Sequence, residues 1–131
     1  MKLAPGLAAI AACAIAAPAL AHHSFAMFDS EKSIKVTGTV KELEWTNPHS
    51  WLRVMVVDQA TGKPVQWAFE MGPPQQQIRR GWKPDSLKPG DTVSLTMHPL
   101  KDGARGGQLV DATLPDGRTV GGAGAPPLPG N

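Results

Sequence analysis

Five short segments of the sequence alternate between apolar and polar residues, a period of two that is typical of half-buried β-strands. Turn sequences such as "TNPH" (46–49) and "ATGK" (60–63) separate them. The segments cover residues 35–45 ("KVTGTVKELEW"), 50–58 ("SWLRVMVVD"), 64–71 ("PVQWAFEM"), 91–98 ("DTVSLTMH") and 107–114 ("GQLVDATL"). A chain patterned in this way must fold mainly as β-sheet.

The first segment carries a break in its alternation. Its apolar side runs through Val36, Gly38 and Val40, then slips by one residue to Leu43 and Trp45. A slip of one residue predicts a β-bulge, and glycine within a strand suits strong coiling.

One helix is predicted, over residues 73–81 ("PPQQQIRRG"), with proline at its start and Gly81 just past its end. Five short strands with one short helix between the third and fourth predict an all-β fold, a small OB-like Greek-key barrel. In the last strand we expect Val110, Ala112 and Leu114 to face inward. A small open β-sandwich is the alternative fold.

The first 21 residues have the features of a secretory signal peptide. Lys2 is followed by an apolar, Ala-rich run, which ends in the small-residue pattern Ala19-x-Ala21. Prolines and a glycine interrupt the run, which argues against a transmembrane helix. We therefore predict a periplasmic protein without a transmembrane segment after processing. The alternative is lipid anchoring at Cys13, because Ile10–Cys13 resembles a lipobox.

Cleavage after Ala21 divides the rest of the chain into three parts. Residues 22–33 form an N-terminal arm, residues 34–119 the barrel domain, and residues 120–131 a Gly/Pro-rich tail predicted to be disordered or a tether. Cys13 is the one cysteine, so no disulfide can form in the processed chain. Without Lys2 the chain has 12 basic and 11 acidic side chains. This nearly even balance argues against a nucleic-acid partner.

Histidines are the main candidates for chemistry. In OB-folds the loops between strands one and two and between strands four and five flank the ligand-binding face. The first of these loops, "TNPHS" (46–50), carries His49, and the second, "HPLKDGARGG" (98–107), begins with His98. We therefore expect the two histidines on the same side of the barrel. The alternative is that both are ordinary solvated loop residues.

The sequence also predicts a metal site at the N-terminus of the processed chain. Cleavage would free the α-amine of His22, which can chelate a metal together with its own ring Nδ1. A further histidine (His23, His49 or His98) would complete an arrangement that suits Cu(II). Met27 is a soft auxiliary donor that favours Cu(I). Met71 is expected to be similarly accessible, whereas Met97 and Trp67 are expected in the core.

These residues predict an exported copper chaperone or buffer, with the metal ion and an exported protein as its partners. We do not predict an enzyme, because the sequence has no Gly-x-Ser-x-Gly elbow, nucleophilic cysteine or paired catalytic carboxylates. Two other functions stay open. One is a peptide- or saccharide-binding module using Asn47, Trp51 and Arg105, and the other is an accessory subunit of an exported complex.

Several stretches resemble a family of small exported bacterial proteins filed as a domain of unknown function. They include "HHSFAMFD", "EWTNPHSW", "LKPGD" and "HPLKDG", and the resemblance runs from His22 to about Arg118. It implies export and a compact β domain, but no activity. More distantly, the layout is similar to CusF-type periplasmic copper chaperones. This chain has no closely spaced Met-x-Met, so none of their ligands can be carried over to its positions.

Overall fold

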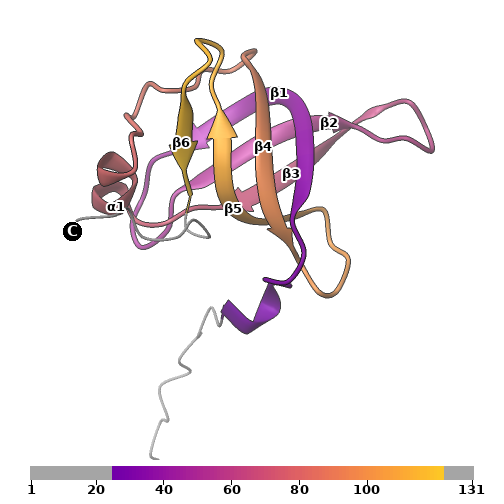
Figure 1. The fold of residues 1–131 in the computed structure, drawn as a ribbon. Coiled ribbons are helices and arrows are strands. Elements are labelled where there is room, and N and C mark those ends of the chain that lie inside the picture. Colours follow the sequence, from indigo (N-terminus) through magenta and orange to yellow (C-terminus); the bar gives the residue numbers. More distant parts are fainter. Residues whose placement is uncertain (1–24, 123–131) are drawn as a thin grey trace, which may run out of the picture.

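The computed structural model describes residues 25–122, which form a β-barrel with one short α-helix (Figure 1). The N-terminal arm begins with a 3₁₀ turn, η1 (Phe25–Met27). The remaining elements are β1 (Ile34–Glu44), β2 (Trp51–Val57), β3 (Pro64–Glu70), α1 (Pro74–Arg79), β4 (Thr92–Pro99), β5 (Gly106–Thr113) and β6 (Thr119–Gly121).

Five strands close into a barrel. Each of the pairs β3–β2, β2–β1, β1–β4 and β4–β5 is antiparallel, and a short parallel pairing of β3 with β5 joins the two ends. The helix lies between β3 and β4 in the chain. The predicted all-β small barrel is confirmed.

The predicted bulge in β1 is confirmed, because the register with β2 shifts between Val40 and Glu42. A second shift, which the sequence analysis missed, lies between β4 and β5 at Thr96 and Met97. This shift leaves Val110 half-buried, while Leu109 and Ala112 are both buried. The expectation that Val110 faces inward was therefore wrong, because one extra residue changes which side chains face the core.

Mostly aliphatic side chains form the core, and Trp82, which follows α1 in the chain, is buried with them. The Trp82 indole Nε1 donates a hydrogen bond to the Gly121 carbonyl at 2.6 Å. The buried set is Val36, Val40, Leu52, Val54, Phe69, Met71, Trp82, Leu87, Val93, Leu95, Met97, Leu109, Ala112, Leu114 and Val120.

Met71 is fully buried, so the expectation that it is accessible was wrong. Its backbone N–H donates to the Ser50 carbonyl at 2.9 Å, and the Ser50 N–H donates to the Gly72 carbonyl at 3.1 Å. This reciprocal pair continues the β2–β3 ladder beyond the end of β3 and holds Met71 in the core.

The sheet extends further than the predicted domain. Val120 and Gly121, assigned to the tail from the sequence, belong to β6, and Val120 lies in the core. The predicted signal peptide, Cys13, His22, His23 and residues 123–131 of the tail lie outside the described residues.

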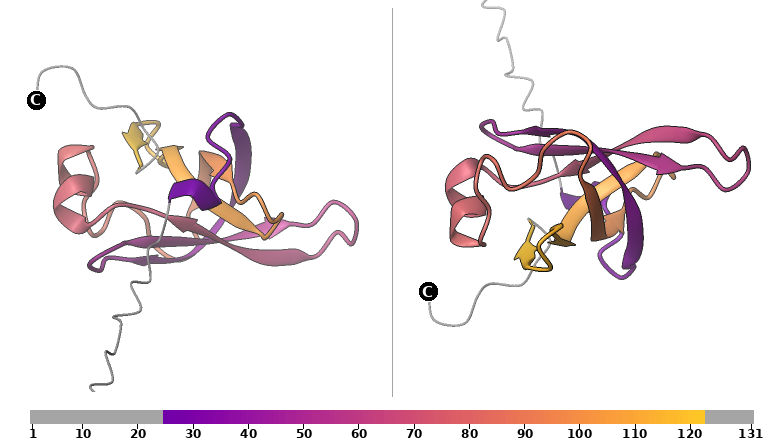
Figure 2. Two further views of the ribbon diagram at one scale, coloured as in Figure 1. Left: turned by 90° about the horizontal axis from the view of Figure 1, so that it is seen from below. Right: turned by 90° about the horizontal axis from the view of Figure 1, so that it is seen from above.

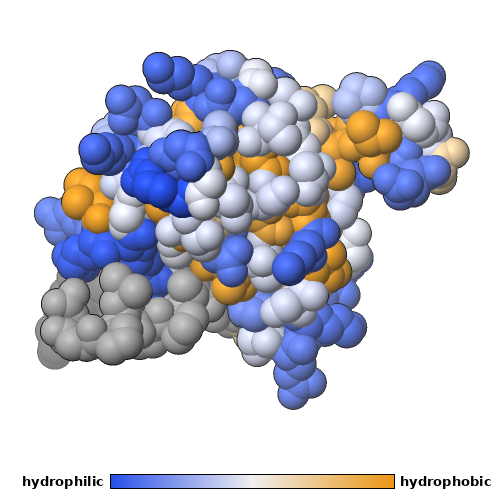
Figure 3. Space-filling view, turned by 45° about the horizontal axis from the view of Figure 1, so that its top comes forward, coloured by the Kyte–Doolittle hydropathy of each residue, from blue (hydrophilic) through white to orange (hydrophobic). Residues whose placement is uncertain are grey.

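The β2–β3 hairpin and α1 lie at opposite sides of the barrel (Figure 2). The hairpin extends beyond the barrel because β3 pairs with β5 only over Ala68–Glu70. On the face shown in Figure 3, hydrophobic residues reach the surface as separate patches between polar ones. Within residues 25–122, no helix has the length and apolar character needed to cross a membrane.

The closing β3–β5 pair predicts a large difference between two glycine substitutions. Gly106 has φ +142°, and a Cβ there would collide with the Ala68 carbonyl oxygen; Gly103 has φ +80° and open space around it. We expect Gly106→Ala to lower the free energy of unfolding by about 3 kcal/mol, and Gly103→Ala by about 1 kcal/mol. Urea unfolding measures both. Equal losses would contradict a requirement for close approach at Gly106.

Candidate functional site

The N-terminal arm is fastened along the end of β4 and the start of the β4–β5 loop (residues 100–105). Phe28 forms an antiparallel bridge with Leu100. The Lys101 N–H donates to the Met27 carbonyl at 3.0 Å, and the Asp29 N–H donates to the Pro99 carbonyl at 2.9 Å. Phe28 is buried in this position. The arm therefore forms part of the folded domain from η1 onward.

The turn that follows is fixed by an ion pair. The Lys32 ammonium lies 2.9 Å from an Asp29 carboxylate oxygen. The hydrogen bond from Lys32 lowers the pKa of the Asp29 carboxyl below its ordinary value, so the carboxylate keeps its charge to a lower pH than an unpaired aspartate. The pair helps to set the direction in which the arm enters β1.

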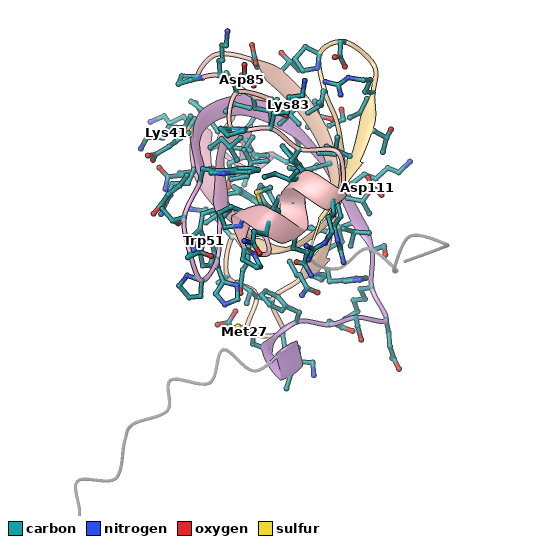
Figure 4. The ribbon with its side chains drawn as sticks, turned by 90° about the vertical axis from the view of Figure 1, so that its left-hand side faces the viewer. Met27, Lys41, Trp51, Lys83, Asp85 and Asp111 are labelled. Atoms are coloured by element: carbon teal, nitrogen blue, oxygen red, sulfur yellow. The ribbon has the colours of Figure 1, made fainter. Side chains whose placement is uncertain are left out.

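A small cavity of about 150 Å³ lies between the arm and the outer side of β3. Its lining residues are Met27, Phe28, Trp51, Ala68, Glu70, Leu100 and Gly107. Figure 4 shows Met27, on η1, and Trp51 at the same end of the molecule. Met27 is 42% exposed, so this residue is accessible to solvent.

Glu70 is the buried charge of this region. Its side chain lines the cavity, and the residue is only 4% exposed. His49 Nδ1 lies 3.1 Å from Glu70 Oε1. A carboxylate that contacts one ring nitrogen fixes the orientation of the imidazole. Metal-binding histidines are commonly oriented in this way, by a carboxylate at the ring nitrogen that does not bind the metal.

The β1–β2 loop (residues 45–50) positions His49 through its own hydrogen bonds. The Thr46 hydroxyl donates to the His49 carbonyl at 2.9 Å, and the Ser50 hydroxyl donates to the Thr46 carbonyl at 3.3 Å. Ser50 is fully buried and paired with the segment after β3. The loop therefore carries His49 to the end of β3, where Glu70 lies.

His98 and Glu70 belong to one row of residues that lie opposite one another across neighbouring strands. Unlike His49, which contacts Glu70, His98 contacts the arm. The register places His98 opposite Gln108, Gln108 opposite Glu70, and Glu70 opposite Trp51. The His98 Nδ1 atom lies 2.7 Å from the Lys32 carbonyl oxygen. His49 thus contacts the barrel at Glu70, whereas His98 contacts the arm, and Gln108 stands between the two positions.

Residues 25–122 contain no group of three or more His, Cys, Asp or Glu side chains that could hold a metal ion. The predicted metal ligands are His22, His23, His49, His98 and Met27. Of these, His49, His98 and Met27 lie within the described residues. A histidine-based site at this end of the barrel needs donors from the residues before Phe25.

The residues of the alternative ligand site do not converge. Trp51 begins β2 and lines the cavity, and Asn47 is exposed in the adjacent loop. The Arg105 guanidinium instead lies 3.2 Å from Asp58, which follows the last residue of β2. Asp58 lies seven residue steps beyond Trp51 along extended chain, roughly 20 Å.

Glu70 and Phe28 were missed as site residues by the sequence analysis. Alternation places Glu70 on the polar side of β3, where a solvated carboxylate is expected. No local pattern signals that the arm and the β1–β2 loop enclose it. The "WAFEMG" stretch, in which a single acid stands between apolar residues, was the only signal available.

The comparisons identify a family but no characterised relative. The sequence model of DUF6152, a family of unknown function, matches residues 9–109, which include β1 to β4, α1 and the first half of β5. Neither the curated proteins nor the solved structures contain a match to the chain, so the likeness to CusF-type chaperones stays a prediction. Because the match covers most of the sequence, the chain belongs to the DUF6152 family.

Proposed function

We propose that this protein is an exported, periplasmic copper-binding protein that acts as a chaperone or buffer. The metal is held where the arm meets the barrel, by His22 through its amine and ring, by His49, and by His23 or Met27 as a further donor. His98 serves mainly to hold the arm. The protein delivers or stores the ion and does not catalyse a reaction.

The observation that carries this proposal is the fixed position of the arm. Its first described residues pack beside Glu70, which holds His49 by Nδ1. His22 and His23 precede Phe25 by only three and two residues. An extended residue spans about 3.3 Å, so roughly 10 Å of chain separates His22 from Phe25, and we propose that this length lets the two histidines meet His49.

The donor types also suit copper. Imidazole binds Cu(II) well, and Cu(II) stands highest among the divalent first-row metals in affinity for nitrogen ligands. Thioether sulfur from Met27 favours Cu(I). A site with both donor types at its edge would accept copper in either oxidation state.

The first test is the intact mass and metal content of untagged protein recovered from the periplasm. We expect a chain that starts at His22 and holds about one copper ion. A chain that starts at His22 and binds no copper on titration would contradict the proposal.

A one-residue extension tests the role of the N-terminal amine. A glycine placed before His22 moves the amine away from the ring and removes the small chelate ring. We expect weaker copper binding with an unchanged unfolding midpoint in the metal-free protein. Unchanged affinity would exclude the amine of His22 as a ligand.

Side-chain variants test the barrel half of the site. We expect His49→Ala to lower copper affinity by at least tenfold, and Glu70→Gln to lower it by about 10- to 100-fold, since Glu70 orients His49. His98→Ala should lower the affinity less than His49→Ala, because it loosens the arm but removes no proposed ligand. Isothermal titration gives all three affinities. A loss for His98→Ala as large as that for His49→Ala would contradict the assignment of His49 as a ligand and His98 as a support.

A further inference from the structure

The cavity under the arm has an apolar and aromatic lining that the copper proposal does not use. Its volume of about 150 Å³ is below the roughly 300–1,000 Å³ of pockets for drug-sized molecules. It therefore suits a compact group of a few heavy atoms. Met27, at 42% exposure, leaves one wall open to solvent.

The walls of this cavity are apolar and partly aromatic. The lining residues include the aromatic Phe28 and Trp51 and the apolar Met27, Leu100 and Ala68. Gly107 adds no side chain. A ligand in this space must have an apolar surface.

Glu70 is the one charged side chain in the lining, and it is almost completely buried. A buried carboxylate is costly unless a cation or hydrogen-bond donors compensate it. His49 Nδ1 contacts one carboxylate oxygen. The charge of Glu70 repels anionic ligands and attracts cations, and the apolar walls offer few partners for the hydroxyls of a saccharide.

We infer that this cavity binds a quaternary ammonium group. A primary ammonium has three N–H donors that need acceptors, and Glu70 is the single carboxylate in the lining. A quaternary ammonium has no N–H donor, presents methyl groups to the walls, and is attracted both to aromatic faces and to a carboxylate. This inference does not rest on the proposed copper site, although the two share Met27 and Glu70, and it applies to the metal-free chain.

Two sources could present this group, a free cation such as choline or the headgroup of a choline lipid. The chemistry recognised is the same in both. The primary experiment therefore uses the purified, metal-free chain and two small probes, choline and dimethylbutanol, in which a neutral carbon replaces the nitrogen.

We expect choline to shift the NMR signals of the Gly107 amide and the Trp51 indole N–H in a saturable way. Dimethylbutanol should bind at least about tenfold more weakly, since it lacks the cation–π and carboxylate attraction. Equal binding of the two probes would overturn the inference, because the cavity would then recognise shape alone. Absence of choline shifts at these positions would overturn it as well.

Matched variants assign the attraction to its groups. Glu70→Gln keeps the shape of the side chain and removes its charge, and Trp51→Leu removes a ring. Each should weaken choline binding by about tenfold. Trp67→Leu is the control, because Trp67 lines a different surface groove, with Ile34 and Val57. If Glu70→Gln binds choline as tightly as the unchanged protein, the assignment to Glu70 is wrong.

Sedimentation with vesicles separates the two sources. Binding to phosphatidylcholine vesicles but not to phosphatidylglycerol vesicles, lost in Glu70→Gln, would identify a lipid headgroup. Choline shifts without vesicle binding would identify a soluble cation. Because these measurements use no metal, their failure leaves the copper titrations unaffected, and the reverse also holds.

Discussion

The parallel pairing of β3 with β5 is the contact on which the rest of the structure depends. It turns an open sheet into a closed barrel, and it spans only three residues of each strand. The approach is close enough that a side chain at Gly106 or Gly107 would collide with the backbone of Ala68 or His98. The same pairing sets Glu70 opposite Gln108 and therefore fixes the row that runs from Trp51 to His98.

Much of this barrel could be predicted because its information is local. The alternation in β4 identified Val93, Leu95 and Met97 as core residues, and the slip after Val40 identified the bulge. The bulge opposite Thr96 could not be predicted. Leu109, Val110 and Ala112 are all apolar, so the sequence of β5 is compatible with more than one register, and only the contact with β4 decides between them.

The candidate site was harder to predict because it is assembled from distant parts of the chain. The positions of His49 and Met27 were recognised as unusual from the sequence, but their neighbours were not. Glu70 becomes a buried charge only when the arm and two loops meet over the end of β3. Likewise, Arg105 has the right chemistry for a ligand site, but its ion pair with Asp58 turns it towards the hairpin.

The attachment of the arm affects the rate at which a ligand can enter or leave the cavity beneath it. The arm supplies two walls of the cavity, Met27 and Phe28, and backbone hydrogen bonds with Pro99 and Lys101 hold it along one edge. Segments held in this way open locally at a lower free energy than the global unfolding of a domain. Release of the arm would dismantle the cavity while the barrel stays folded. The residence time of a ligand in the cavity would then be set by the opening of one short segment. A partner that bound the arm could therefore release the ligand without unfolding the protein.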